Sequence, residues 1–317
     1  MRQPTPELQA KLRRVRLVLM DIDGTLVTSS QDVFGNVANQ LRRLRRFAVP
    51  FSLATGRTIS GSGPIVERLR AEVGMRMPPV INYNGAVMLS AESGSLVIRH
   101  VLDQPSVIEA VSACKEAGLW PLVYACRDTV AGPPMETVYL DQAAPPSVEF
   151  NGMATVRLPH LSLVQDDVVA ILADAGNPFS SARVAETLGK HLGTRLRATT
   201  SGSRYVEICS PNATKSFAMK RLANLHHIEV DQVMAIGDNL NDLEMLRDAG
   251  VGIAVGNAPD EVKAASDYAC SHSSASGVVE ALRMLVQVLR VQGGTTGERD
   301  CAGTGMQATS ENVSIRC

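Results

Sequence analysis

The chain has 317 residues, of which 45% are hydrophobic, so it can bury a substantial core as one large domain or two smaller ones. Its 31 lysines and arginines nearly balance 32 aspartates and glutamates, and the net charge of −1 excludes a global attraction to nucleic acid or to anionic membranes. The six cysteines form no C-x-x-C pair and no compact group, which excludes a disulfide scaffold and a zinc site of common spacing.

The sequence shows no segment that would carry the protein into a membrane. Arg13, Arg14 and Arg16 interrupt the place where a secretory apolar region would stand, and no apolar stretch approaches the ~20 residues that span a bilayer. We therefore expect a cytoplasmic protein, monomeric or weakly homo-oligomeric, with neither nucleic acid nor a membrane as its partner.

Short apolar segments alternate with helical patterns along most of the chain. This alternation predicts a parallel sheet with helices on its faces. Helices with an apolar face are expected at 37–47, 65–73 and 216–225. The basic run at 41–46 is interpreted as the solvated face of the first helix, because its leucines recur at helical spacing. The strands are expected at 15–20, 50–54, 80–83, 232–236 and 251–255.

Polar side chains follow four of these expected strands. Asp21, Thr55, Asn84 and Asp238 each stand at or near the downstream end of one strand. Because open α/β sheets bind their ligands beyond the carboxyl ends of the strands, we expect these four side chains to converge.

The pattern changes in the middle of the chain. Apolar segments at 87–90 and 96–102 flank Ala-Glu-Ser-Gly-Ser, which predicts an antiparallel hairpin. After it come a predicted helix at 106–117, apolar segments near Leu122 and Val138, and a predicted helix at 163–174. This mixture predicts an α+β domain inserted into the sheet as a lid.

These patterns divide the chain into three parts. The expected core comprises residues 1–86 and 201–292, and the expected cap comprises 87–200. Residues 293–317 begin with Gly-Gly-Thr-Thr-Gly and show little apolar periodicity, which predicts a flexible tail.

The first motif is Asp-Ile-Asp-Gly-Thr at 21–25, directly after the apolar run 17–20. Alternation along an extended segment places Asp21 and Asp23 on one side, and Gly24 permits a sharp turn that leaves backbone amides accessible. Such carboxylates can bind Mg²⁺, and a carboxylate can attack phosphorus to form an aspartyl-phosphate. Taken alone, the segment also fits a turn with solvated carboxylates.

A second acidic motif, Gly-Asp-Asn-Leu-Asn-Asp at 237–242, repeats this arrangement after the apolar run 233–236. Its carboxylates are expected to approach Asp21 and Asp23, and such a concentration of negative charge becomes favourable when a divalent cation is bound. An Asx-rich turn that caps the next helix explains the same residues without catalysis, and the two interpretations are compatible.

Two further segments offer groups that suit phosphate. Thr55-Gly56-Arg57 supplies a hydroxyl and backbone donors after a strand, although a turn or a helix cap fits this triplet equally well. Lys215 begins a helical stretch and can place its ammonium against phosphate or a carboxylate, although most single lysines are merely solvated.

In combination, D-x-D-G-T, T-G-R, a later lysine and G-D-x-x-N-D occur in the order and strand contexts of the haloacid dehalogenase-like phosphohydrolases, and the chain closely resembles that superfamily. Asn84-Gly85-Ala86, the large insertion before Lys215, and Gly277-Val278 resemble its Cof-type branch. The likeness spans roughly residues 15–290. It implies an α/β fold with a Rossmann-like parallel-sheet core and an inserted α+β cap of the C2 type.

The resemblance also implies roles for individual residues. Asp21 would be the nucleophile, and Asp23 the acid/base that protonates the leaving alkoxide and then activates water. Thr55 and Lys215 would complete the catalytic group. The phosphoryl oxygens would be held by the Ile22 backbone, Thr55, Gly56, Lys215 and Asn241. Mg²⁺ would be bound by Asp21, the Asp23 backbone carbonyl and Asp238, with Asp242 in support.

We therefore expect a Mg²⁺-dependent phosphatase for a small phosphorylated metabolite, such as a sugar, polyol or cofactor phosphate. The resemblance implies that Asp23 favours hydrolysis or transfer of a phosphate ester, because the dehalogenases and phosphonate-cleaving members of the superfamily lack an aspartate at this position. Two alternatives stay open: transfer of the phosphoryl group to another alcohol, and a non-enzymatic phosphate sensor. The sensor is the weaker alternative, because it would not need the leaving-group acid Asp23.

Overall fold

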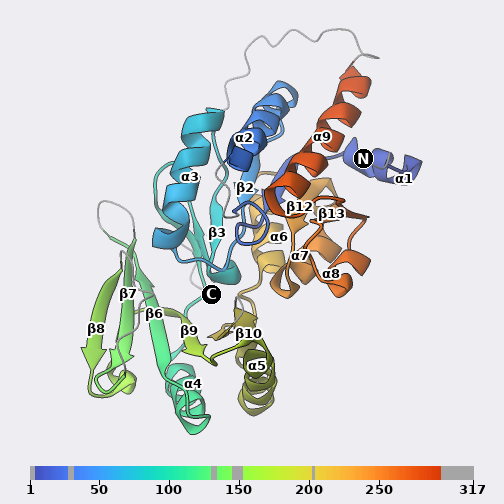
Figure 1. Cartoon of the computed structure of the whole chain (residues 1–317). Coiled ribbons are helices and arrows are strands. Elements are labelled where there is room, and N and C mark those ends of the chain that lie inside the picture. Colours follow the sequence, from blue (N-terminus) through green and yellow to red (C-terminus); the bar gives the residue numbers. More distant parts are fainter. Residues whose placement is uncertain (1–3, 28–31, 130–133, 145–152, 202–203, 294–317) are drawn as a thin grey trace.

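The computed structural model describes residues 4–27, 32–129, 134–144, 153–201 and 204–293. Figure 1 shows a larger upper part that contains both ends of the described chain and a smaller lower part built from the middle of the sequence. Among the described residues, no helix combines the length and the apolar character needed to span a bilayer.

The core is organised around a parallel five-stranded sheet. Its strand order is β14-β13-β12-β1-β2. The strands are β1 (Leu17–Met20), β2 (Phe51–Leu53), β12 (Val233–Gly237), β13 (Val251–Ala254) and β14 (Tyr268–Ala269). All four residues of β1 are buried, with Val18 and Met20 in one hydrophobic cluster and Leu17 and Leu19 in another. Apolar side chains therefore cover both faces, as expected for a parallel sheet.

Helices cover both faces of this sheet. One face packs against α1 (Pro6–Leu12), α2 (Asp32–Leu44), α3 (Ile59–Val73) and α9 (Ser274–Gly293). The other packs against α6 (Lys215–Leu225), α7 (Leu243–Asp248) and α8 (Asp260–Ala264). Short 3₁₀ turns occupy Arg45–Phe47, Tyr83–Gly85, Leu161–Leu163, Val230–Gln232 and Leu240–Asp242.

A small antiparallel sheet joins the core to the inserted domain. It consists of β3 (Val80–Asn82), β4 (Val87–Leu89) and β5 (Leu96–Arg99). A bridge between Ala54 and Ile81 links it to the edge of the main sheet. The predicted hairpin is confirmed as β4 and β5, and it pairs with the core strand β3.

The inserted domain is a six-stranded sheet with helices on one face. Its strand order is β10-β11-β9-β6-β7-β8. The strands are β6 (Pro121–Arg127), β7 (Met135–Asp141), β8 (Ala154–Leu158), β9 (Val168–Asp174), β10 (Arg197–Ser201) and β11 (Tyr205–Cys209). Helices α4 (Gln104–Glu116) and α5 (Pro178–Leu192) lie below the sheet in Figure 1, on the side away from the core. The other face contributes Leu122 and Tyr124 to a cluster with Tyr83 and Ala86. The sheet therefore covers one side of the core as a cap.

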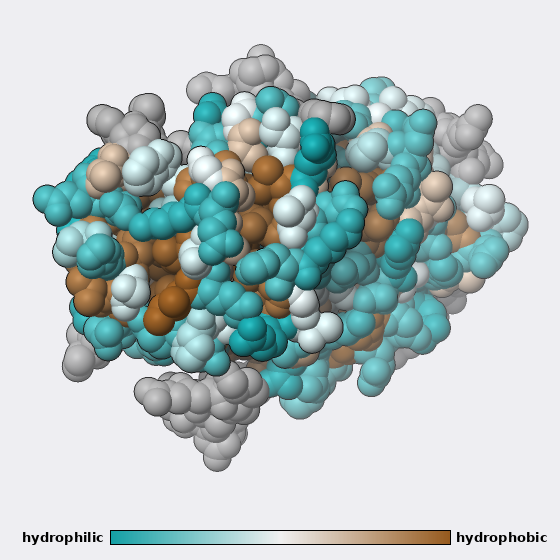
Figure 2. Space-filling view, turned by 90° about the horizontal axis from the view of Figure 1, so that it is seen from below, coloured by the Kyte–Doolittle hydropathy of each residue, from teal (hydrophilic) through white to brown (hydrophobic). Residues whose placement is uncertain are grey.

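The outer surface of the cap is mixed in character. Seen from below in Figure 2, brown apolar areas appear between teal hydrophilic side chains. Large apolar residues of the cap that are more than a third exposed are Ile108, Trp120, Met135, Val156 and Leu163.

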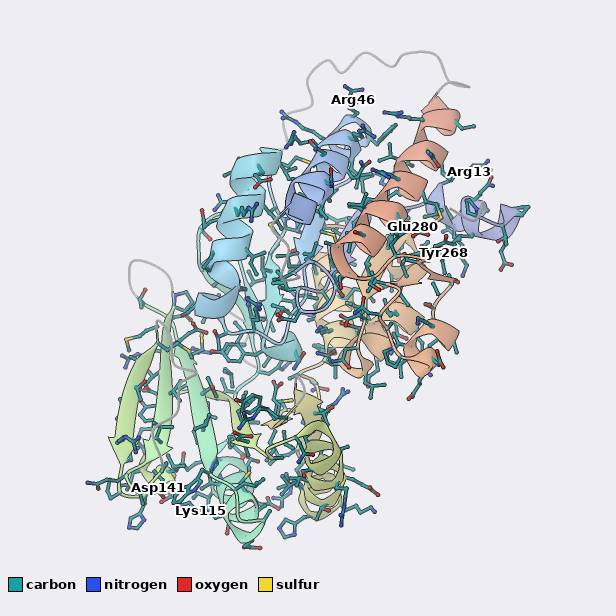
Figure 3. The ribbon with its side chains drawn as sticks, viewed as in Figure 1. Arg13, Arg46, Lys115, Asp141, Tyr268 and Glu280 are labelled. Atoms are coloured by element: carbon teal, nitrogen blue, oxygen red, sulfur yellow. The ribbon has the colours of Figure 1, made fainter. Side chains whose placement is uncertain are left out.

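Most of the predicted elements are confirmed. Each expected core strand appears within a few residues of its predicted limits. The basic run lies on α2 and the following turn, where Leu41 and Leu44 are buried and the arginines are exposed. Arg46 is labelled at the outer end of that helix in Figure 3.

Two predictions need correction. The predicted helix at 163–174 is wrong, because residues 168–174 form the buried strand β9. A short apolar run cannot be assigned to helix or strand from periodicity alone, and this one lies between two paired strands. The predicted start of the helix at residue 65 is too late: α3 begins at Ile59, where the side chain of Thr58 accepts a hydrogen bond from the Gly61 amide.

The predicted domain limits differ from the limits of the sheets. The six-stranded sheet runs from Pro121 to Cys209, and β4 pairs with the core strand β3 while β5 pairs with β4, whereas the cap was expected at 87–200. The division into domains at 87 and 200 stays a prediction. The predicted flexible tail lies outside the described residues, apart from Gly293 at the end of α9.

Candidate active site

The polar residues expected at strand ends lie where the core meets the cap. Asp21 directly follows β1, Asp238 directly follows β12, and Thr55 stands two residues after β2. Asn84 lies in the turn after β3, with a left-handed φ of 50°. Contacts among them and with Lys215, at the start of α6, bring these chain-distant segments into one site.

Lys215 is at the centre of this site. Its side chain has no exposed surface, and its Nζ lies 2.6 Å from Asp21 Oδ1 and 2.7 Å from Asp242 Oδ1. Burial lowers the pKa of Lys215, but the two carboxylates outweigh that effect and hold its pKa above the usual value. The ammonium therefore stays charged between them.

Three carboxylates lie close together at this site, and two of them pair with the ammonium. Asp21, Asp238 and Asp242 each offer an oxygen within 4.8 Å of the others. Burial is the main cause that raises the pKa of Asp21 well above its usual value, and Asp242 and Asp238 add to it. Burial, followed by the charge of Asp242, also raises the pKa of Asp238 to about 6. One lysine leaves this cluster with excess negative charge, and carboxylate oxygens so arranged fit a divalent cation.

Asp238 and Asp242 differ in how their oxygens are engaged. Asp242 Oδ1 accepts from Lys215, while its Oδ2 accepts from the backbone amides of Asp238 and Asn239 at 3.0 and 3.1 Å. Asp238 is partly exposed and accepts from the Thr25 hydroxyl at 2.7 Å. Asp242 is fully buried and its oxygens accept from an ammonium and two backbone amides, whereas Asp238 is partly exposed, so Asp242 fits a supporting place beside a metal rather than direct ligation.

The turn after Asp21 requires a glycine. Gly24 has a φ of +80°, and a Cβ at this position would lie 2.2 Å from Asp238 Oδ2. The carbonyl of Ile22 accepts hydrogen bonds from the amides of Leu26 and Val27, which closes the turn. The close approach of the two acidic motifs therefore depends on the missing side chain at Gly24.

Asp23 does not join the buried cluster. Its side chain is 57% exposed and is held by Arg57, with Nε 2.8 Å from Oδ2 and Nη2 2.5 Å from Oδ1. The hydrogen bond to Asp23 raises the pKa of the Arg57 guanidinium. The sequence left Arg57 without a role, and the structure makes it the partner of the expected acid/base.

The remaining predicted phosphate-binding residues lie beside the cluster. Thr55 is fully buried, and its Oγ1 accepts a hydrogen bond from the Arg57 amide at 3.1 Å. Gly56 faces Asn84 so closely that a Cβ there would lie 3.1 Å from the Asn84 amide group. Asn241 donates from Nδ2 to Asn84 Oδ1 at 2.9 Å.

Three residues around the site were missed from the sequence. Thr25 and Asn257 both donate hydrogen bonds to Asp238, and Glu207 of the cap accepts one from Asn84 Nδ2 at 2.5 Å. Thr25 ends the first motif, and Asn257 follows β13, so the rule that placed Asp21 at a strand end would have found Asn257 too. Glu207 carries no comparable signal.

A family model described as haloacid dehalogenase-like hydrolase matches residues 18–282. The chain belongs to this family. Phosphatase YwpJ of Bacillus subtilis is 25% identical over 291 residues, covering 86% of this chain and all of the relative. Phosphoglycolate phosphatase of Methanoculleus marisnigri is 27% identical over 271 residues, covering 85% of this chain and 96% of the relative.

Solved structures agree with this assignment. A haloacid dehalogenase-like hydrolase from Bacteroides thetaiotaomicron superposes with a TM-score of 0.68 at 25% identity, covering 85% of this chain and 98% of that one. The predicted family with its Cof-type branch, and the predicted parallel-sheet core with an inserted cap, are confirmed. The predicted enzyme class, a phosphoric monoester hydrolase, is confirmed as well.

Proposed function

We propose that this haloacid dehalogenase-like hydrolase is a Mg²⁺-dependent phosphatase that uses Asp21 as its nucleophile. The observation that carries the proposal is the group of Asp21, Asp238 and Asp242, three carboxylates that each offer an oxygen within 4.8 Å of the others, of which only Asp21 and Asp242 pair with the ammonium of Lys215. A structural ion pair needs only one carboxylate for each lysine. The surplus acidic groups suit a site that receives both a cation and a phosphate.

The donor set fits Mg²⁺, which prefers a few carboxylate oxygens in its coordination shell. Asp21, Asp238 and the backbone carbonyl of Asp23 are the proposed ligands, and Asp242 supports them through the amides of the 238–239 turn. When bound, Mg²⁺ would polarise a phosphoryl oxygen and neutralise charge that develops during transfer.

The proposed reaction has two steps. The Asp21 carboxylate attacks phosphorus and forms an aspartyl-phosphate, while the bond from phosphorus to the alcohol oxygen breaks and Asp23 gives its proton to that oxygen. Asp23 then takes a proton from water, and the resulting hydroxide attacks phosphorus and releases Asp21 and inorganic phosphate. Throughout, the phosphoryl oxygens would be held by Thr55, Lys215, Asn241 and the backbone of Ile22 and Gly56.

The cap supports a small substrate. Its sheet packs against the core, and Glu207 accepts a hydrogen bond from Asn84, so the cap restricts access to the site. Phosphoglycolate, in the name of one relative, is a small phosphorylated metabolite. We therefore propose a sugar, polyol or cofactor phosphate, or a phosphorylated acid of similar size, as the substrate. A cytoplasmic monomer or weak homo-oligomer stays part of the proposal.

The experiment is turnover of p-nitrophenyl phosphate by the purified full-length chain with Mg²⁺. Release of p-nitrophenolate is expected, with loss of activity both in Asp21→Asn and after addition of EDTA. A rate in Asp21→Asn equal to that of the unaltered protein would contradict the assignment of the nucleophile. A panel of metabolite phosphates, ranked by kcat/KM, then identifies the substrate class.

A further inference from the structure

One carboxylate of the cap is inserted into the core at some distance from the acidic cluster. Glu136, on β7, is only 6% exposed. Its Oε1 accepts hydrogen bonds from the Ile59 amide at 2.7 Å and from the Tyr83 hydroxyl at 2.5 Å. Its Oε2 accepts from the Ser60 amide at 2.7 Å, and the Ser60 hydroxyl donates to the same oxygen. All these donors belong to the core.

The contact is chemically well matched. Ile59 and Ser60 are the first two residues of α3, and the amides of a first helical turn have no partner within the helix. A carboxylate at this position satisfies two of them and is favoured by the positive end of the helix dipole. Burial, followed by the charge of Glu136, raises the pKa of Tyr83 well above its usual value, so its hydroxyl stays a donor. Glu136 is therefore a docking group between cap and core.

The same turn of α3 holds Arg57. The Arg57 Nη1 donates to the carbonyl of Gly61 at 3.0 Å, and the Arg57 carbonyl accepts from the amide of Tyr83 at 3.0 Å. The two core segments that bind Glu136 thus also fix the backbone and the side chain of Arg57. The Arg57 guanidinium in turn donates hydrogen bonds to both carboxylate oxygens of Asp23.

We propose that Glu136 is a positioning residue that couples the seating of the cap to the orientation of Asp23. This inference rests on the proposed function, in which Asp23 protonates the leaving oxygen. When the cap is seated, Glu136 orders the 59–61 turn and Tyr83, these hold Arg57, and Arg57 keeps Asp23 beside the site; one of the two Asp23 oxygens must leave Arg57 to carry the proton that the acid step needs. When the cap lifts, the amides of Ile59 and Ser60 lose their partner, and the turn that fixes Arg57 loosens.

The test uses two substrates that differ in their need for an acid. p-Nitrophenolate leaves readily without a proton, whereas the alkoxide of an alkyl phosphate must be protonated as it departs. Glu136→Gln should therefore lower kcat for an alkyl phosphate such as glycerol phosphate by about tenfold or more, and kcat for p-nitrophenyl phosphate by less than about threefold. Asp23→Asn should change the ratio of the two rates in the same direction.

Two comparisons separate this role from a merely structural one. If Glu136 acts through Asp23, the double variant Glu136→Gln/Asp23→Asn should show the same ratio as Asp23→Asn alone, because coupled residues are not additive. Glu244→Gln removes a different cap–core ion pair, in which Arg197 Nη2 of β10 lies 3.1 Å from Glu244 Oε1 of α7. Glu244→Gln should change both rates by the same factor, because this ion pair does not involve α3.

An equal fall in both rates for Glu136→Gln, or no fall at all, would overturn the inference. If Glu136→Gln does not fold, Tyr83→Phe removes only the hydroxyl that binds Glu136 and should shift the ratio in the same direction to a smaller extent. An unaltered protein that hydrolyses neither substrate would defeat the proposed function itself. If the unaltered protein is active but Glu136→Gln leaves the ratio of the two kcat values unchanged, only the role of Glu136 is contradicted.

Discussion

The Nζ of Lys215 lies 2.6 Å from Oδ1 of Asp21, where neither side chain has more than 6% of its surface exposed. An ion pair this deeply buried is destabilising to break, because the remaining charge has no water to solvate it. Lys215 is therefore both a candidate phosphate ligand and a structural counter-charge.

Lys215→Met is expected to lower the free energy of unfolding by roughly 3–5 kcal/mol, since Asp21 and Asp242 lose their shared ammonium. Urea denaturation at neutral pH in EDTA measures this. The matched control is Lys220→Met on the same helix, whose half-exposed ion pair with Asp248 should be worth less than about 1 kcal/mol. Equal losses in the two variants would show that burial at Lys215 has no special effect.

Mg²⁺ should stabilise the folded protein through Asp238. At a concentration 100 times its Kd, a ligand that binds only the folded state adds about 2.7 kcal/mol, seen as a rise in the thermal midpoint over EDTA. Asp238→Asn should abolish most of that rise. Asp231→Asn, which alters an exposed carboxylate paired with Arg14, should keep it. If Asp238→Asn keeps the full Mg²⁺-dependent rise in thermal midpoint, Asp238 is not a ligand of the metal.

The free energy of unfolding should depend on pH through Glu280, which lies beside Tyr268 in Figure 3. Burial raises the pKa of Glu280, but hydrogen bonds from His272, Tyr268 and two backbone amides outweigh it and bring the pKa below the ordinary value of 4.5. A carboxyl with a lowered folded-state pKa stabilises the protein above the unfolded-state value, and this contribution is lost as pH falls through the folded-state value.

Glu280→Gln should therefore weaken the protein at pH 7 by about 1–3 kcal/mol, because buried donors lose a charged acceptor. It should also flatten the decline in stability below pH 4.5. Urea titrations at several pH values give both quantities. A decline as steep as in the unaltered protein would mean that other carboxyl groups account for the acid sensitivity.

The close approach at Gly24 predicts a loss of Mg²⁺ response in Gly24→Ala. The new Cβ would meet Asp238 Oδ2 at 2.2 Å, so Asp238 must move. Gly74→Ala is the matched control, because Gly74 also has a positive φ, +64°, but a new Cβ there would have no atom of the described residues, other than its chain neighbours, within 4 Å. Both variants should lose about 1–2 kcal/mol from backbone strain. Only Gly24→Ala should lose the Mg²⁺-dependent rise in thermal midpoint, and a retained rise would argue against the displacement of Asp238.

Sequence reasoning succeeded where the signal was local. Asp21 and Asp238 each follow an apolar run, and the rule that parallel strands present their ends at one edge was enough to bring them together. It failed at β9, because a seven-residue apolar segment has no period that separates a buried strand from a helix.

The partners between cap and core could not be read from the sequence at all. Glu136 is 77 residues from Ile59, and Glu207 is 123 residues from Asn84. Nothing near either glutamate distinguishes it from a solvated strand residue, since its partner is fixed only by how the cap sits on the core. Arg57 stayed without a role for the same reason, because its contact with Asp23 depends on the turn that opens α3.

The cap has a hydrophobic cluster of its own, formed by α4, α5 and the sheet face that they cover, and this cluster is separate from the two that support the parallel sheet. Substitutions within this outer cluster can therefore accumulate without disturbing the packing of the strands that carry Asp21 and Asp238, whereas the core-facing side of the cap sheet shares a cluster with Tyr83 and Ala86 of the core. The cap can therefore change its own packing while the strand ends of the core keep Asp21 and Asp238 in place.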